Sequence, residues 1–470
     1  MLNRLNLKED NVLVLKNAQI IIGDGLTKPF SGSIAIEDGI IAGVTPGNLG
    51  GGVGDTVIDL AGRLVVPGAI NPHAHATAPG PRFASGTPGV SLSESLGNLR
   101  RHLSQGHTTV VDLDGFKLPE ENAQVRGVQP VKVEMSTVHF EPMFEAADAA
   151  DGMGLNEAHR TATAHQLNDQ GAVVIGEVGA GMTLGGGGQD YLYIPAAFEE
   201  ATGVRLTTGQ AQALKYAVLG RYIKRGKTDR NKVAELIQEY GLAPLTVDGA
   251  VELIEQSVLP SFQVALDGLV SSASLAVELG LPTLVHNSAP SDDATRAAAE
   301  VAENLFIGGH TNHITFTPEE SIESAKFIKK QGGYVEIDTF DLWGRKVLTK
   351  DSAHLIAMMQ ADVVDIIATD YAAGHWDGMW EMVAGIVQVG LSSIEKAVAL
   401  ATGNVAKALP RIGADRGLIK PGLIADLVVT SPKTLADIEL VLINGEIAFT
   451  GTSGGPLPMS QLAAAEAILK

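Results

Sequence analysis

The middle of the chain alternates short apolar segments with longer stretches of helical periodicity, and this alternation limits the fold more than any other feature. Such regular succession is typical of a parallel α/β barrel, in which each strand is followed by a covering helix. One helix has a clear start at Thr317-Pro318-Glu319-Glu320, which supplies a capping threonine, an early proline and a glutamate at the third position. We expect eight barrel strands at Leu64–Asn71, Thr109–Asp114, Val131–Val138, Ala172–Val178, Pro282–Asn287, Leu305–His310, Tyr334–Thr339 and Val364–Asp370.

Both ends of the chain have a different texture, made of short β-rich segments separated by turns. Gly23-Asp24-Gly25 and Asp38-Gly39 are turn sequences near the N-terminus, and Asn444-Gly445 is a hairpin turn near the C-terminus. This texture predicts one small β-sandwich domain built from both chain ends. The expected division is a sandwich made of residues 1–66 and 410–470, and a distorted TIM (β/α)8 barrel over residues 67–409.

About a hundred residues separate the fourth and fifth expected strands, far more than a normal barrel connection. The stretch opens with a flexible glycine run, Gly185 to Gly188, and continues with helical patterns. We interpret residues from about 184 to 265 as an insertion that forms a lid or a subunit contact, and we expect a homo-oligomer, either a dimer or a tetramer. The basic residues of the insertion, including Lys215 and Arg221, are expected to form a solvated or inter-subunit face.

Composition excludes several functions. The formal net charge of −20 opposes nucleic-acid binding, which needs a basic surface to neutralise phosphates. The absence of cysteine excludes disulfides and thiolate metal ligands, so any metal must be held by histidine and carboxylate. It also fits a reducing cytoplasm, which is the expected location. Because the sequence has no signal-peptide core and no run of roughly 20 apolar residues, we expect no membrane partner. The expected partner is a small-molecule substrate.

Metal-capable residues stand where the expected strands end. In a parallel barrel the active site lies at the carboxyl ends of the strands. His73 and His75 follow the first strand, and residues two apart on an extended segment point to the same side, so both can reach one ion. Strands four, five, six and eight also end on a metal-capable group. These groups are Glu177, His286, His310 and Asp370.

Each of these residues has an ordinary explanation when it is taken alone. Most His-x-His pairs bind nothing, a lone histidine at a strand end is more often a hydrogen-bonded core residue, and Asp370 alone would be interpreted as a helix cap. Taken together, however, five strands with such groups at matching ends are improbable by chance. The sequence therefore predicts a metal centre with histidine and carboxylate ligands.

The same residues resemble the pattern of the amidohydrolase superfamily. The resemblance is carried by His73-Ala74-His75, His286, His310 and Asp370, and in the chain ends by Ile36-Glu37-Asp38-Gly39-Ile40-Ile41 and Gly417-Leu418-Ile419-Lys420-Pro421-Gly422. It covers most of the chain apart from the insertion. Within the superfamily, Gly176-Glu177-Val178-Gly179 and His310-Thr311-Asn312 resemble the enamidases, which hydrolyse cyclic amides.

This resemblance implies a site and a reaction. It assigns His73, His75 and Asp370 to one divalent metal ion, His286 and His310 to a second, and Glu177 to a bridging position where many relatives use a carboxylated lysine. The implied reaction is hydrolysis of a C–N bond other than a peptide bond, in a cyclic amide, by a metal-bridging hydroxide with Asp370 as general base and then acid. The expected metal is zinc, and iron, manganese and cobalt also suit such ligands.

Five further residues are candidates for substrate contacts, because they follow strands one, six and eight. These are Arg82, Asn312, His313, His375 and Trp376.

Two other functions stay open. One is a mononuclear deaminase acting on a ring amidine carbon, although Asn287-Ser288-Ala289-Pro290 after His286 lacks the glutamate typical of one such form. The other is a non-catalytic interaction protein on the same fold, although such relatives usually lose metal ligands and this chain retains all of them.

Overall fold

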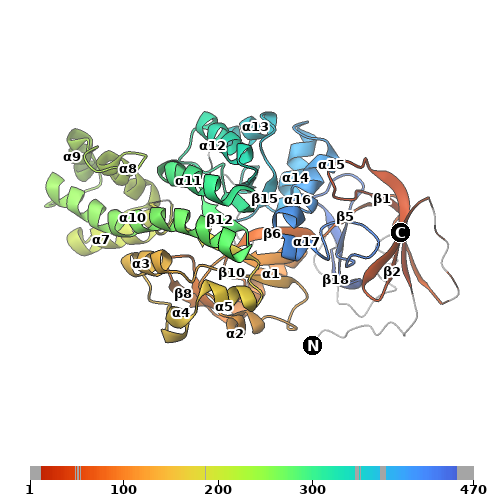
Figure 1. Cartoon of the computed structure of the whole chain (residues 1–470). Coiled ribbons are helices and arrows are strands. Elements are labelled where there is room, and N and C mark those ends of the chain that lie inside the picture. The colour runs from red at the N-terminus through yellow and green to blue at the C-terminus, as the bar shows by residue number, and fades with distance from the viewer. Residues whose placement is uncertain are drawn as a thin grey trace.

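Parallel strands in the middle of the chain form the predicted barrel (Figure 1). The structure is a computed structural model that describes residues 12–47, 49, 52, 54–185, 187–343, 349, 351–370 and 377–451. Neighbouring strands pair in the order β15-β14-β13-β12-β11-β10-β9-β6, so chain order and spatial order agree around the barrel. The strands are β6 (Ala69–Ala74), β9 (His107–Asp112), β10 (Lys132–Thr137), β11 (Val174–Val178), β12 (Thr283–His286), β13 (Phe306–Gly309), β14 (Tyr334–Asp338) and β15 (Ile366–Ala368). Each overlaps one expected strand.

The first and last strands of the barrel are joined by a side chain. Asn71 of β6 donates from Nδ2 to the Thr369 hydroxyl (2.7 Å) and accepts from the Thr369 backbone N–H (3.2 Å). The Asp370 N–H then donates to the carbonyl oxygen of His73 (2.9 Å). These bonds set the carboxyl ends of β6 and β15 side by side, so His73 and Asp370 start from adjacent backbone.

The first expected strand, Leu64–Asn71, is two strands rather than one. β5 (Leu64–Pro67) pairs with strands of a second sheet, and β6 begins the barrel at Ala69. Gly68 lies at the crossing point, where a Cβ atom would come within 2.2 Å of the Thr108 side chain. The unbroken apolar run hid this change of sheet, because an apolar pattern cannot show which strand an extended segment pairs with.

The second sheet is built from both chain ends. Its order is β18-β17-β16-β5-β1-β2-β3, with β4 also paired to β1. Alternate residues of this sheet pack in two different hydrophobic cores. Val65 and Leu427 lie in a core formed by the two chain ends, whereas Val66 and Val428 lie in the core that continues into the barrel. Asn444-Gly445 has positive φ at both residues (52° and 72°), as a type I′ hairpin requires. The remaining strands are β1 (Leu13–Ile20), β2 (Phe30–Glu37), β3 (Ile40–Pro46), β4 (Thr56–Asp59), β16 (Leu427–Thr430), β17 (Ile438–Ile443) and β18 (Glu446–Thr450).

Helices surround the barrel, and α12 (Pro318–Lys330) begins as predicted. The Thr317 hydroxyl accepts from the Glu320 N–H (3.3 Å), and the Glu320 carboxylate accepts from the Thr317 N–H (2.8 Å). A short hairpin of β7 (Gly80–Arg82) and β8 (Thr87–Val90) follows β6. The other helices outside the insertion are α1 (Leu92–Ser104), α2 (Pro119–Ala123), α3 (Glu141–Ala150), α4 (Glu157–Thr161), α5 (Ala164–Asp169), α11 (Asp292–Ala302), α13 (Ala353–Gln360), α14 (Met379–Gln388), α15 (Ile394–Ala399), α16 (Gly403–Ala408) and α17 (Pro410–Gly413), with 3₁₀ turns η1 (Ala289–Ser291) and η2 (Glu303–Leu305).

The long connection between β11 and β12 forms a helical lobe at the end of the molecule away from the second sheet (Figure 1). The predicted insertion ends near residue 265, but that position lies inside a continuous helix. The helix continues to Leu279 and packs on α3 and α11 as part of the barrel wall, so the lobe does not separate there. The lobe contains α6 (Gly187–Tyr191), α7 (Tyr193–Thr202), α8 (Thr208–Leu219), α9 (Arg230–Glu239) and α10 (Val247–Leu279).

Among the described residues, α10 is the one helix that is long and apolar enough to cross a membrane by length and composition. This helix differs from the prediction, which contained no such segment. In the structure, 39% of its most apolar window is buried inside the protein, and Ile254, Val258 and Leu269 have no exposed surface. The apolar side of α10 is therefore used for packing against the lobe and the barrel.

Candidate metal centre

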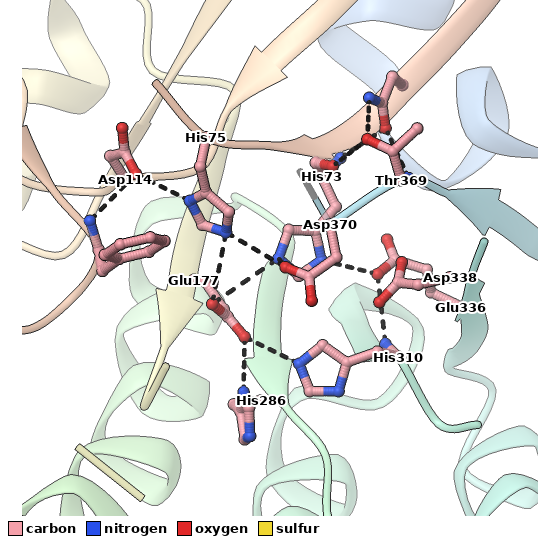
Figure 2. Close-up of polar contacts among 12 residues, drawn as sticks. His73, His75, Asp114, Glu177, His286, His310, Glu336, Asp338, Thr369 and Asp370 are labelled. Carbon is pink, nitrogen blue, oxygen red and sulfur yellow. Dashed lines mark hydrogen bonds and ion pairs between the residues drawn. The ribbon is translucent and has the colours of Figure 1, made fainter. Parts of the chain in front are cut away.

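The six predicted ligands converge at the carboxyl end of the barrel (Figure 2). They fall into two groups, and in each group one potential ligand atom per residue lies within 4.8 Å of all the others. The first group is His73, His75, Glu177 and Asp370, and the second is Glu177, His286 and His310. Glu177 belongs to both groups, so it connects two neighbouring candidate positions for a cation.

Glu177 divides its carboxylate between these two groups. Its Oε1 lies 2.9 Å from His286 Nδ1 and 3.0 Å from His310 Nε2. Its Oε2 lies 3.7 Å from His73 Nε2 and 3.9 Å from His75 Nε2. Asp370 Oδ1 completes the first group, at 3.1 Å from His73 Nε2 and 3.3 Å from His75 Nε2.

Three of the histidines are oriented by an acceptor on their outer nitrogen. An acceptor at Nδ1 keeps the imidazole proton there and turns the lone pair of Nε2 inwards, which is how metal-binding histidines are commonly held. The pairs are His73 with the Glu336 carboxylate (2.8 Å), His75 with the Asp114 carboxylate (2.8 Å) and His310 with the carbonyl oxygen of Asn287 (3.1 Å).

The donor set fits divalent cations. Ligand atoms about 2.0–2.2 Å from a tetrahedral ion lie roughly 3.3–3.6 Å from one another, close to the spacing of the inward-facing atoms here. Nε2 of His73 faces the centre and is buried without a hydrogen bond of good geometry among the described residues, and such an atom calls for a ligand. A third cluster joins His73 to Glu336 and Asp338, but His73 uses its Nδ1 there to bond Glu336, so we interpret that cluster as support for His73.

Carboxylates dominate the charge of the centre. Burial alone would lower the pKa of His75, but hydrogen bonds to Asp114 and Asp370 raise it to about 9. Burial also opposes ionisation of Glu177, yet hydrogen bonds from His286 and His310 hold the pKa of this carboxyl well below its usual range. The centre thus stabilises positive charge on His73 and His75, whereas burial and the neighbouring His310 lower the pKa of His286. A bound cation would take over this role, because histidine binds metal in its neutral form.

Asp370 is the ligand that faces the opening of the centre. Its side chain is 23% exposed, whereas His73 has no exposure and Glu177 has 3%. Asp370 and His310 both follow their strands with positive φ (55° and 32°), a left-handed backbone that non-glycine residues adopt rarely, although aspartate and histidine adopt it more readily than most. Of the carboxylates at the centre, Asp370 is therefore the most exposed.

Sequence reasoning missed the charged residues behind the ligands. Lys117 Nζ lies 2.7 Å from Asp112 and 2.6 Å from Asp114, and all three side chains are buried. Asp112 also accepts from backbone N–H groups of the segment after β6, which fixes the path of the chain beside His75. A signal was present, because Asp112 and Asp114, like Glu336 and Asp338, are acidic residues two apart at the carboxyl end of an apolar strand.

Asn312, another expected substrate contact, is bound to the backbone of β14. It accepts from the Asp338 N–H and donates to the Asp338 carbonyl oxygen, at 2.9 Å each, and its side chain is buried. It therefore braces β14, and its contact with a substrate stays a prediction. His375 and Trp376 lie outside the described residues.

Two other expected contacts lie close to the centre. The ring of His313 is 5.3 Å from the rings of both His286 and His310. Arg82 is separated from the centre by the ring of Phe83. The Phe83 ring is 4.8 Å from the ring of His75, and the Arg82 guanidinium is 5.7 Å from the Phe83 ring. Contact of either residue with a substrate stays a prediction.

Of the basic residues expected to form a solvated face, Lys215 is buried and Arg221 is partly exposed, at 34% of its side chain. Lys215 is fully buried, and its Nζ lies 2.6 Å from both the Asp190 carboxylate and the carbonyl oxygen of Gly185. Arg221 donates to the carbonyl oxygen of Thr315 (2.6 Å), in the loop after β13. Both residues tie the lobe to loops that follow strands bearing candidate ligands.

Comparisons with known proteins give the family. The chain matches the model of the amidohydrolase family over residues 64–455. It is 24% identical to enamidase from Eubacterium barkeri over 172 residues, which is 36% of this chain and 42% of that enzyme. It is 39% identical to dihydropyrimidinase 1 from Caenorhabditis elegans over 67 residues, which is 14% of this chain and 13% of that enzyme. The chain therefore matches less than half the length of either enzyme.

A solved structure supports the fold. A Xaa-Pro dipeptidase with bound methionine has a TM-score of 0.56 at 15% identity, over 94% of this chain and 100% of that one. Such low identity speaks for the fold alone. The family model, by contrast, spans every barrel strand that carries a candidate ligand and both halves of the second sheet in part. This chain belongs to the amidohydrolase family.

Proposed function

We propose that this protein is a binuclear, metal-dependent hydrolase that cleaves the C–N bond of a cyclic amide. One observation carries the proposal: one oxygen of the Glu177 carboxylate faces His286 and His310, and the other faces His73 and His75. A carboxylate shared in this way is suited to bridge two cations. The similarity to enamidase over 172 residues supports the choice of a cyclic amide as the substrate class.

The proposed ligand sets follow the two groups around Glu177. His73, His75 and Asp370 hold one cation, His286 and His310 hold the other, and Glu177 serves both. Bound divalent cations would supply Lewis acidity, which polarises a carbonyl group and lowers the pKa of a shared water from about 15.7 towards about 7. Imidazole and carboxylate ligands suit zinc, which is our first choice, and also iron, manganese and cobalt.

Asp370 carries the proton chemistry in this proposal, because it is the exposed ligand. Its carboxylate takes one proton from the attacking water as the water oxygen bonds to the carbonyl carbon. It then gives that proton to the ring nitrogen, which keeps the electron pair of the breaking C–N bond. The second water proton is released from the new carboxylic acid, and Asp370 returns to its ionised form. General acid–base catalysis of this kind contributes roughly 10²–10⁴-fold.

The test combines metal analysis with turnover. Metal-loaded protein should contain two ions per chain, and the variant Glu177→Gln should hold fewer. On a panel of lactams, hydantoins and ring amidines, we expect ring opening of a lactam or hydantoin. One ion per chain with no effect of Glu177→Gln would contradict the binuclear centre.

The alternatives predict other outcomes in the same assays. Release of ammonia from a ring amidine by protein with one ion per chain would favour a deaminase. Two ions per chain with no turnover on any panel compound would count against the cyclic-amide proposal and favour either another C–N substrate or a non-catalytic role.

A further inference from the structure

His313 lies beside the candidate metal centre but is not one of its expected ligands. It follows β13 by a tight turn, in which the His313 N–H donates to the carbonyl oxygen of His310 (2.8 Å). Its ring packs against those of His286 and His310 and retains 9% exposure. The chemistry of such a histidine depends on which ring nitrogen carries the proton.

Hydrogen bonds around Thr315 decide the position of that proton. The backbone N–H of Thr315, which can only donate, lies 3.3 Å from Nδ1 of His313. The Thr315 hydroxyl accepts from the Ala289 N–H (3.1 Å), so its own proton is free to be donated to His313 Nδ1 at 2.8 Å. Nδ1 of His313 therefore accepts two hydrogen bonds, one from the Thr315 N–H and one from the Thr315 hydroxyl. A neutral His313 must carry its proton on Nε2, and no acceptor among the described residues takes it.

The insertion fixes this arrangement from outside. Arg221, just after α8, donates to the carbonyl oxygen of Thr315 (2.6 Å) and to the Glu320 carboxylate (2.8 Å). The Tyr222 hydroxyl donates to the same carboxylate (2.6 Å). Glu320 in turn caps α12, so the loop that carries His313 and Thr315 is held between the lobe and a barrel helix.

We propose that His313 is a neutral hydrogen-bond donor, through Nε2–H, to the carbonyl oxygen of the substrate as negative charge develops on it, and that Arg221 positions His313 through Thr315. This inference rests on the proposed function, because only an acyl-transfer reaction develops charge at that oxygen. Fixed donors aimed at such an oxygen are among the largest contributors to catalysis. The lobe thereby acts on the reaction through one hydrogen-bonded loop.

The first test needs no substrate. Protein labelled with ¹⁵N in its histidine rings is compared with the variants His313→Gln and His313→Phe by NMR, with and without added zinc. The signals lost in both variants should be those of a neutral imidazole protonated at Nε2. A charged ring, or a ring protonated at Nδ1, would overturn the inference even if the protein proves to be a cyclic-amide hydrolase.

The second test uses the panel compound that is turned over fastest. His313→Phe should lower kcat by roughly 10²–10³-fold, the effect of removing one oxyanion donor, while the metal content stays at the wild-type value. His313→Gln should recover part of this loss, because its amide N–H can approach the position of Nε2–H. The shape of the pH–rate profile should stay the same, since the proposed role moves no proton to or from His313. Loss of the acidic limb in His313→Phe would instead identify a proton-transfer role and refute the proposal.

The role of Arg221 is tested by a double-mutant cycle. Arg221→Met should lower kcat about tenfold with little change in KM, and Arg221→Lys should restore part of the loss. In the His313→Phe background, Arg221→Met should have no further effect, because both changes remove the same interaction. Arg230, an exposed residue of the same lobe that pairs with Asp248, provides the control Arg230→Met, which should leave kcat unchanged. Additive losses from Arg221→Met and His313→Phe would show that Arg221 does not act through His313.

Discussion

Histidines lie buried at both ends of the barrel, and the two groups differ in what surrounds them. At the carboxyl end, four histidines meet Glu177 and Asp370, with further carboxylates behind them. At the other end, His102 of α1 and His107 at the start of β9 contact each other, with 2.7 Å between their Nδ1 atoms. Both members of this pair are fully buried, as His73 is.

The difference lies in the carboxylates rather than in burial. At the metal centre, carboxylate partners overcome burial and raise the pKa of His75 to about 9. In the other pair, burial acts without such a partner and lowers the pKa of His102 to about 3. Nε2 of His102 and of His107 are enclosed without a partner among the described residues, yet no carboxylate comes with them. A buried histidine pair is therefore a site for positive charge only where acidic residues accompany it.

The largest expected effect concerns the carboxylate that faces the opening. Asp370→Asn keeps an oxygen that can bind a cation but cannot accept and return a proton. The turnover rate should therefore fall by roughly 10²–10⁴-fold or more, while substantial metal stays bound. Single-turnover kinetics and metal analysis of the same preparation check both parts. Near-normal turnover in Asp370→Asn would assign the proton transfer to another group.

A smaller effect is expected from the carboxylates behind the histidines. Asp114→Asn removes the charged acceptor from His75 Nδ1, and the loss of such an outer partner typically weakens metal binding by roughly 10–100-fold. Competition with a chelator measures the change. Glu278→Gln is the matched control, because Glu278 also pairs with a histidine, His165, but on the surface. The metal affinity of the Glu278→Gln variant should equal that of the wild type. Equal affinity in Asp114→Asn would show that the ligands are oriented without this carboxylate.

The same contrast explains how far the sequence could be interpreted. The ligands could be found because strand ends in a parallel barrel meet at one edge, so His286 and Asp370, far apart in sequence, were expected together. The support behind them was harder to see, because Asp114, just after β9, and Glu336, within β14, act through histidines on other strands. Their role depends on which strands are neighbours, and a single strand pattern does not contain that information.

The insertion was the least predictable region for a related reason. The helices α6 and α7 were missed, but because helical periodicity is local, helices close to α8, α9 and α10 were expected, at residues 210–225, 229–240 and 248–279. The fate of its basic residues was not, because Lys215 and Arg221 are long side chains whose partners, Asp190, Gly185 and Thr315, lie in other segments. A charged residue is usually solvated, and only the packed structure shows which one is not. The single misjudged strand, Leu64–Asn71, failed in the same way, since pairing rather than apolar character decides where it divides.

The smallest expected effect tests the carboxylate-free pair through the pH dependence of stability. The folded pKa of His102 is about 3, below its value of about 6.5 in an unfolded chain. Between these values the unfolded state holds a proton that the folded state does not, so acidification favours unfolding. The free energy of unfolding should therefore fall by about 1 kcal/mol per pH unit as the pH drops below 6.5, and this contribution should end near pH 3.

Replacing both histidines isolates that contribution. His102→Leu/His107→Leu removes two titrating groups together, so neither is left without its hydrogen-bond partner, and a paired apolar replacement can be nearly neutral at pH 7. Urea denaturation at pH 7, 6 and 5 should then give a shallower loss of stability in the double variant than in the wild type. The acidic residues of the metal centre contribute equally to both proteins, so they cancel in the difference. His165→Gln, at an exposed histidine, should keep the wild-type slope. An unchanged slope in the double variant would mean that the pair is already protonated in the folded state. The presence or absence of a carboxylate would then no longer explain a difference in charge between the buried histidines at the two ends of the barrel.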